Sequence, residues 1–363
     1  MAKTGSCLLP LHYGRAPPWL FSKMKLLGRA IYEVIELEFG RDEFLRRVSD
    51  PFWFQAFGCV LGFDWHSSGL TTTVCGALKE SLDPWEHGIV VLGGKGSASR
   101  KTPDEIQSAG EKFNLSYSKT MDLVYASKMT AKVDNTAIQD GYQLYHHSFF
   151  LTEDGKWAVI QQGLNDSTSY ARRYHWLSEN INSFVNEPHS AICCDKKEER
   201  VLNTVANESK ESRSIMVDVV QENPERIKRH LIQLSLSKVG FEYGFTMSSE
   251  HEIDVHLYKK FIDLNEFKPR TYEELLAFKG VGPKTIRALA LISDLIYGTP
   301  PSWKDPVKYS FSHGGKDGFP YPVDKLQYDK SIELLKTAIE NARINDYEKL
   351  RALDRLKTYA SIE

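Results

Sequence analysis

A glycine-rich turn between two apolar segments is the part of this chain best suited to chemistry. It runs Phe278-Lys279-Gly280-Val281-Gly282-Pro283-Lys284-Thr285. Glycine tolerates positive φ and lets another backbone approach closely, and a proline at a first helical position starts a helix. The amides from Gly282 to Lys284 should then point outward at the positive end of a helix dipole, where a phosphate binds without any reading of base sequence. We therefore predict a DNA-backbone contact, in preference to a hairpin used only for packing, at Gly280, Val281, Gly282, Pro283 and Thr285.

Other reactive residues in the chain have less informative spacing. Gly93-Gly94-Lys95-Gly96-Ser97 follows the β-like run 89–92 but lacks the spacing of a Walker phosphate loop, so we expect a flexible connection. His146 and His147 should point to opposite faces of a strand and cannot share one metal ion, so each favours a structural role. The cysteines show no metal-ligand spacing and are expected to be reduced thiols: Cys7, Cys59, Cys75, Cys193 and Cys194. The residues therefore predict neither a metal nor a cofactor.

Composition places the chain among ordinary globular proteins. It has 363 residues, 41% of them hydrophobic and 26% charged, with a formal net charge of −2. That charge argues against coating a polyanion through bulk electrostatics, so a nucleic-acid contact must be local. The first ten residues lack the pattern of a signal peptide, and no stretch is long and apolar enough to span a bilayer. We expect a cytoplasmic protein with no membrane contact.

The elements that must position the turn fall into two predicted domains of an α+β protein. The first, residues 1–190, is mixed: a helix over 20–35 ended by Gly40, buried aromatics at 52–57, and a helix from Thr102 with Glu105 as its capping partner. A β-hairpin near 142–164 turns at Glu153-Asp154-Gly155. Polar residues at 186–214 suggest the boundary. The second domain, residues 191–363, should be helical, with helices at 224–238, 250–263, 272–278, 283–297 and 329–343.

The turn itself lies inside a predicted hairpin of two helices at 272–297. Thr271 and Glu274 form a capping box for the first helix, whose apolar side includes Leu276. Pro283 begins the second helix, and Gly298 ends it.

This hairpin, followed by a Gly/Pro-rich loop that ends in Val323-Asp324, resembles the helix-hairpin-helix base-excision glycosylases of the endonuclease III-like superfamily. The resemblance covers roughly residues 220–345. Over its whole length the chain also resembles an uncharacterised archaeal and bacterial family, catalogued as a domain of unknown function and linked to repair of oxidised or deaminated bases. The implied partner is double-stranded DNA that contains a damaged base.

The resemblance assigns roles to two residues. Lys284 occupies the position of the catalytic lysine, which attacks C1′ of the sugar and forms a Schiff base. Asp324, at the end of the loop 299–324, would activate the nucleophile and stabilise the sugar cation. The implied activity is a DNA glycosylase with AP-lyase activity, acting on a base of the 8-oxoguanine, hypoxanthine, uracil or 5-hydroxyuracil class.

The chain also departs from the superfamily pattern. Forty residues separate Lys284 from Asp324, Lys325-Leu326 replaces the usual Thr-His, and no cluster of four cysteines predicts an iron–sulfur centre. The enlarged loop carries residues that could form the base pocket or a wedge, or could only pin the loop: Trp303, Phe311, His313, Phe319 and Tyr321.

Two other functions stay open at this level. The hairpin could belong to a non-catalytic DNA-binding protein. A nuclease could instead have its active site in the first domain, where the polar candidates are His12, Arg15, Asp64, Trp65 and His66. The sequence assigns neither an oligomeric state nor a role for that domain.

Overall fold

The fold is a central antiparallel sheet with helices on both faces, which confirms the prediction of a mixed α and β protein. The computed structural model describes residues 16–63, 68–194, 197–236, 256–307 and 325–360. Five strands pair in the order β1-β3-β4-β5-β6, and every pairing between neighbours is antiparallel. The strands are β1 (Ile89–Lys95), β3 (Gln143–Thr152), β4 (Trp157–Asn165), β5 (Tyr170–Leu177) and β6 (Ala191–Cys193).

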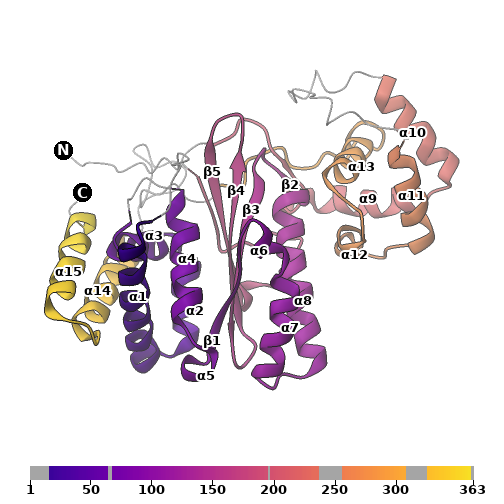
Figure 1. The fold of residues 1–363 in the computed structure, drawn as a ribbon. Coiled ribbons are helices and arrows are strands. Elements are labelled where there is room, and N and C mark those ends of the chain that lie inside the picture. The colour runs from indigo at the N-terminus through magenta and orange to yellow at the C-terminus, as the bar shows by residue number, and fades with distance from the viewer. Residues whose placement is uncertain (1–15, 64–67, 195–196, 237–255, 308–324, 361–363) are drawn as a thin grey trace.

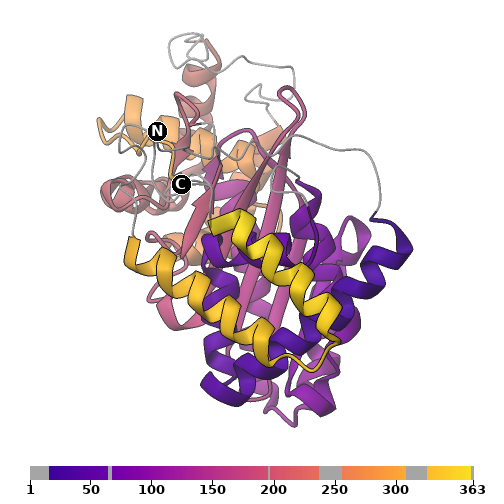
Figure 2. The same ribbon diagram turned by 90° about the vertical axis from the view of Figure 1, so that its left-hand side faces the viewer.

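One face of the sheet is covered by the first helices of the chain. These are α1 (Pro18–Phe39), α2 (Arg41–Ser49), α3 (Pro51–Val60) and α4 (Gly69–Ser81), and the short α5 (Pro84–His87) leads into β1. Gly40 ends α1 at φ +85°, as predicted. The last helices, α14 (Lys325–Asn341) and α15 (Asp346–Ala360), pack on α1 and α3 and share their buried core (Figures 1 and 2).

The other face of the sheet carries α7 (Thr102–Lys112) and α8 (Tyr117–Lys132), beyond which lie the remaining helices (Figure 1). Those helices are α9 (Lys210–Gln221), α10 (Pro224–Leu236), α11 (His256–Phe267), α12 (Tyr272–Ala277) and α13 (Pro283–Leu295). A π-helical turn, η1 (Val133–Ala137), joins α8 to β2 (Ile138–Gln139), which pairs with β7 (Leu202–Asn203).

Two buried apolar clusters hold these layers together. The outer cluster joins α1–α4, one face of the sheet, and α14–α15. The hairpin-side cluster joins the opposite face of the sheet to α7 and α8 and to helices α9–α13. Both clusters therefore contain residues from each side of the boundary expected near residue 190. The helices after residue 324 pack with the amino-terminal helices, whereas the sequence pattern had grouped them with α9–α13.

Several local predictions hold and others need correction. The β3–β4 hairpin turns at Gly155 with φ +79°, as predicted. The segment at Gly93 and Gly94 is the end of β1, not a flexible connection: Gly93 pairs with Ser148 and donates its amide to Glu105 (2.7 Å). Glu105 therefore does not close the predicted capping box, because α7 begins at Thr102 itself without a side-chain cap.

Polar residues around position 190 do not form a simple linker. Ala191–Cys193 adds the fifth strand to the sheet, and a second short strand follows at Leu202. None of the helices among the described residues is long and apolar enough to cross a membrane.

Candidate functional site

The α12–α13 hairpin begins with a side-chain cap close to the predicted one. The hydroxyl of Thr271 accepts a hydrogen bond from the amide of Glu274 (3.1 Å). The carboxylate of Glu274 accepts from the amide of Arg270 (2.7 Å) rather than from Thr271. Glu274 therefore caps the amide one residue before the predicted one. Helix α12 still begins where the sequence predicts.

The turn between the helices uses its two glycines differently. Gly280 has φ +88°, a conformation that favours glycine. Gly282 has φ −135°, which is extended backbone that any residue adopts, so the expectation of positive φ is wrong at this position. Gly282 offers no side-chain cap to α13, and the first helical amides lack intrahelical acceptors by geometry. Among the described residues, the amides of Lys284 and Thr285 have no acceptor.

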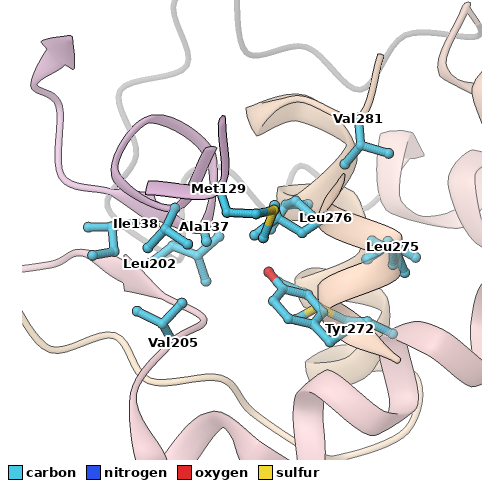
Figure 3. Packing of buried hydrophobic residues seen from close by; sticks show 14 of the residues in the cluster. Met129, Ala137, Ile138, Leu202, Val205, Tyr272, Leu275, Leu276 and Val281 are labelled. Atoms are coloured by element: carbon cyan, nitrogen blue, oxygen red, sulfur yellow. The ribbon is translucent and has the colours of Figure 1, made fainter. Parts of the chain in front are cut away.

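Apolar packing attaches this hairpin to the sheet half of the molecule. Val281, 2% exposed, lies in the hairpin-side cluster, and its amide donates to the carbonyl of Phe278 (3.1 Å), so the predicted DNA contact at Val281 has neither a free side chain nor a free amide. Figure 3 shows hairpin residues and sheet-half residues gathered in one group: Tyr272, Leu275, Leu276 and Val281 with Met129, Ala137, Ile138, Leu202 and Val205.

Hydrogen bonds fix the turn at the same junction. The ammonium of Lys132 donates to the carbonyl of Val281. The side-chain amide of Gln139 donates to the carbonyl of Pro283 (2.9 Å), and its oxygen accepts from Nε of Arg287 (2.9 Å). The hairpin turn is therefore held to the end of α8 and to β2 through the carbonyl groups of Val281 and Pro283.

A pocket of about 460 Å³ lies at this junction. Two stretches of chain line it, the first turn of α13 and the segment from η1 to the start of β3. The lining residues are Asn135, Ile138, Gln139, Asp140, Gly141, Tyr142, Gln143, Pro283, Lys284 and Arg287. Lys284 is exposed, and no partner of its ammonium lies among the described residues. Arg287 is buried, and burial lowers the pKa of its guanidinium to about 10.

A buried ion network forms one wall of the pocket. Arg172 donates to the carboxylate of Asp140 (2.9 Å) and lies over the ring of Tyr142, 4.5 Å from its centroid. Asp140 also accepts from the hydroxyl of Tyr174 (2.7 Å). A second carboxylate, Asp305, reaches Arg172 from the segment after α13. Burial alone would lower the pKa of Arg172, but attraction to the two carboxylates outweighs it and the net shift is upward.

A second polar network lies behind the pocket and centres on Asp134 of η1. Its carboxylate accepts from the indole of Trp176 (3.0 Å) and contacts His189 and the amide of Gln161. Gln161 in turn hydrogen-bonds Nδ1 of His147 (2.8 Å), whose Nε2 contacts the hydroxyl of Ser127. These side chains are buried, so the network holds the π-helical turn against the sheet.

The two neighbouring histidines lie on opposite faces of β3, as predicted. His147 faces Ser127 of α8, whereas His146 hydrogen-bonds Ser148 (3.0 Å) on the face that α4 covers. Burial lowers the pKa of His146 to about 3 and that of His147 to about 4. Both imidazoles are therefore neutral at neutral pH.

Sequence reasoning missed most of the buried polar side chains on the strands. Gln162 lies beside His146 across β3 and β4, and Arg173 follows in β5. Arg173 donates to the side chains of Gln55 (3.1 Å) and Thr71 (3.3 Å). Charged and amide residues normally indicate solvent-facing positions, so only their place inside an otherwise β-prone run could have signalled this layer.

Only some of the residues predicted for the site lie in the part of the chain that the structure describes. Lys284 lines the pocket, but Asp324 lies outside the described residues, as do Phe311, His313, Phe319 and Tyr321. The nuclease candidates His12, Arg15, Asp64, Trp65 and His66 lie outside them too.

Of the loop aromatics, Trp303 is described and is half-buried. It packs against the hairpin-side cluster with the guanidinium of Arg200 5.2 Å from its ring centroid, and it is not among the residues that line the pocket. In the described part of the chain, no group of three or more His, Cys, Asp or Glu residues could hold a metal ion.

Comparison with known proteins places almost the whole chain in one family and adds a short local match. A family model described as "Protein of unknown function (DUF763)" matches residues 5–323. The ribosomal RNA small subunit methyltransferases G of two strains of Leptospira borgpetersenii serovar Hardjo-bovis are each 35% identical over 83 residues. That match covers 23% of this chain and 32% of each methyltransferase, so the chain spans about a third of the length of these curated relatives. No solved structure matches the chain significantly.

Proposed function

The chain belongs to the DUF763 family of proteins of unknown function, and we propose from the geometry of its site that it is a DNA-repair glycosylase with AP-lyase activity. In this proposal α12, the turn and α13 form a helix-hairpin-helix motif that binds the backbone of double-stranded DNA. Lys284 is the nucleophile that attacks C1′ once an oxidised or deaminated base has been turned out of the helix.

The observation that carries the proposal is the position of Lys284. Lys284 belongs to the first turn of α13 and lines a pocket of about 460 Å³, which is within the usual size of small-ligand sites. The unpaired amides of Lys284 and Thr285 lie on the same turn, so one helix end presents both a phosphate-binding group and a nucleophile. A backbone held there would bring a displaced nucleotide close to the amine.

Local charge favours DNA at this place in spite of the negative total. Lys279 and Lys284 are exposed on or beside the turn, and the ammonium of Lys260 lies close to Gly280. Lys132 is bound to the turn from the sheet side. Such a cluster of cations attracts phosphate over a short range, as a protein of net charge −2 requires.

The proposed mechanism also needs a carboxylate that stabilises the sugar cation. The resemblance assigns it to Asp324, and α14, which begins at the next residue, packs with α1 and α3. Asp140 lines the pocket itself, but Arg172 and Tyr174 already engage it. The stabilisation of the sugar cation is assigned to Asp324 on the resemblance alone, since α14 packs in the outer cluster and not with the hairpin, and Asp140 is assigned a positioning role.

Borohydride trapping tests the proposal directly. The full chain is incubated with duplexes that carry uracil, hypoxanthine, 8-oxoguanine or 5-hydroxyuracil, and sodium borohydride is added to reduce any Schiff base. We expect a covalent protein–DNA adduct with at least one duplex and none with Lys284→Gln. Lys357→Gln, which removes an exposed lysine of α15 outside the cation cluster of the turn, is the matched control and should retain the adduct. Absence of an adduct with every duplex would overturn the lyase assignment.

A non-catalytic DNA-binding protein is the second candidate, because the amides of the turn would bind phosphate without any help from the Lys284 side chain. In that case Lys284→Gln would bind duplex as the wild type does, and neither protein would cleave it. A glycosylase predicts equal binding together with loss of cleavage in the variant. Cleavage that survives Lys284→Gln would instead favour the nuclease with a site in the amino-terminal half.

A further inference from the structure

We infer that the pocket beside Lys284 selects a deaminated base, and that the side chain of Asn135 makes this selection. The inference rests on the proposed function only in taking the ligand to be a base turned out of duplex DNA. It follows from which polar atoms of the pocket are still available to a ligand and in which direction they can hydrogen-bond.

Most polar side chains of the pocket already form hydrogen bonds or ion pairs with other groups of the protein. Gln139 uses its amide on the carbonyl groups of Thr136 and Pro283, and its oxygen on Arg287. Asp140 accepts from Arg172 and Tyr174. These groups shape the wall and hold it rigid, but they have little hydrogen-bonding capacity left for a ligand.

Tyr142 is committed in the same way. Its ring lies against the guanidinium of Arg172, and its hydroxyl donates to the carboxylate of Glu198 (3.2 Å) and contacts the thiol of Cys194. Arg287 donates its Nε to Gln139, and the lining side chains with polar atoms that lack a partner among the described residues are Lys284, Asn135 and Gln143.

The group that Asn135 offers a ligand is its NH₂ donor. Its oxygen accepts the backbone amide of Leu144 (3.3 Å), which fixes the orientation of the carboxamide. The opposite end, the NH₂ group of Nδ2, has no partner among the described residues. The preceding residue, Asp134, is tied to Gln161, Trp176 and His189, so the π-helical turn that carries Asn135 is held in place.

Deamination changes whether the exocyclic group of a base donates or accepts a hydrogen bond, and the NH₂ group of Asn135 can bond only to an acceptor. Converting cytosine to uracil, or adenine to hypoxanthine, replaces an exocyclic amino donor with a carbonyl acceptor. The carbonyl can accept from Nδ2 of Asn135, whereas the amino group of the parent base would point a donor at a donor. Asn135 is half-buried, and a parent base seated in the pocket would cover its Nδ2 without offering an acceptor, which disfavours the parent base. Gln143 is exposed, and its carboxamide has no partner in the described part of the chain that would fix its orientation, so we do not assign the selection to it.

The isosteric substitution Asn135→Asp tests the inference. Aspartate keeps an oxygen for the amide of Leu144 and replaces the donor with an acceptor. We would measure equilibrium binding of the full chain to duplexes that differ at one base, uracil against cytosine and hypoxanthine against adenine, together with excision from each. We expect the wild type to prefer each deaminated base at least about tenfold, and Asn135→Asp to lose or reverse that preference.

A second variant at Asn135 and a control variant outside the pocket complete the experiment. Asn135→Ala removes the donor without adding charge beside Lys284 and should also abolish the preference. Asn223→Asp makes the same chemical change at a carboxamide whose oxygen likewise accepts a backbone amide, that of Glu225 (2.9 Å), outside the residues that line the pocket. It should leave the preference unchanged.

The outcomes separate this inference from the proposed function. Excision of 8-oxoguanine with no preference for uracil or hypoxanthine would overturn the inference and leave the glycosylase standing. A preference in binding that depends on Asn135, without excision of any base, would support the inference and contradict the glycosylase. Equal binding of deaminated and parent duplexes, unchanged in Asn135→Asp, would also overturn the inference.

Discussion

Arg172 and Asp305 form a two-point ion pair in which both side chains are completely buried. Nη1 of Arg172 lies 3.0 Å from Oδ1 of Asp305, and Nη2 lies 2.7 Å from Oδ2. Arg172 belongs to β5, and Asp305 belongs to the segment that follows α13. The pair therefore ties the chain that leaves the hairpin to the middle of the sheet, next to the pocket.

Removing Asp305 should destabilise the whole protein strongly. Asp305→Ala leaves the guanidinium of Arg172 buried with one carboxylate in place of two, and the loss of a partner from a buried ion pair costs about 3 to 5 kcal/mol. Urea unfolding would measure the change. Lys304→Ala, which breaks an exposed pair with Glu208, is the control and should change the stability little. Equal losses in the two variants would contradict this account.

The two glycines of the turn should respond differently to alanine. Gly280→Ala forces a side chain into φ +88° and places a Cβ 2.8 Å from the ammonium of Lys260, so we expect a loss of about 1 to 2 kcal/mol. Gly282→Ala meets no atom within 4 Å and should keep its stability. If a phosphate approaches the turn closely, Gly282→Ala should nevertheless weaken DNA binding. Unfolding curves and duplex titrations distinguish the effects, and full DNA affinity in Gly282→Ala would argue against a close phosphate contact.

Acid should destabilise the protein through its buried histidines. The pKa of His147 falls from 6.5 to about 4 on folding, so the folded state binds fewer protons there than the unfolded chain does. The corresponding stability is complete above pH 6.5 and is lost as the pH falls toward 4, by about 1.4 kcal/mol per pH unit. Urea midpoints measured between pH 7 and pH 4 would show the decline. His147→Gln should make it shallower, and an unchanged slope would exclude His147 as a source.

Chelation should leave strand cleavage intact if Lys284 is the nucleophile. The Schiff-base route requires an amine and no metal, so cleavage of a damaged duplex in EDTA should proceed at the rate seen without it. A nuclease that depends on a divalent cation would lose its activity under the same conditions. Adding Mg²⁺ back after chelation completes the comparison, and restored cleavage would favour the nuclease.

Helices and strands whose ends are marked by glycine or proline could be predicted from the sequence. The β3–β4 hairpin has a strong turn at Gly155, and the start of α13 is marked by Pro283. Strand β6 lacks such a signal, because its three residues become a strand only by pairing with β5. The docking of α14 on α1 could not be predicted either, since an amphipathic helix does not specify which apolar face it will cover.

The candidate site was predictable only on its hairpin side. Lys284 stands out because glycine and proline precede it, and the structure places it on the wall of a pocket. The opposite wall comes from residues near 140, and nothing in their spacing connects them to the hairpin. Asn135 is an ordinary polar residue in the sequence. Its role depends on the amide of Leu144 and on a π-helical turn, both of which are set by tertiary packing.

The hairpin-side cluster has a consequence for how this protein can be divided. Val281 and Leu276 are buried in one cluster with residues of α8 and β2, so the sheet half covers part of the apolar surface of the hairpin. A fragment cut out near residue 191 would expose that surface to water and should aggregate or lose its shape. The α12–α13 hairpin is therefore not an independent unit joined to a separate domain. Because Lys132 at the end of α8 binds the carbonyl of Val281, we expect a substitution in α8 to alter the conformation of the turn.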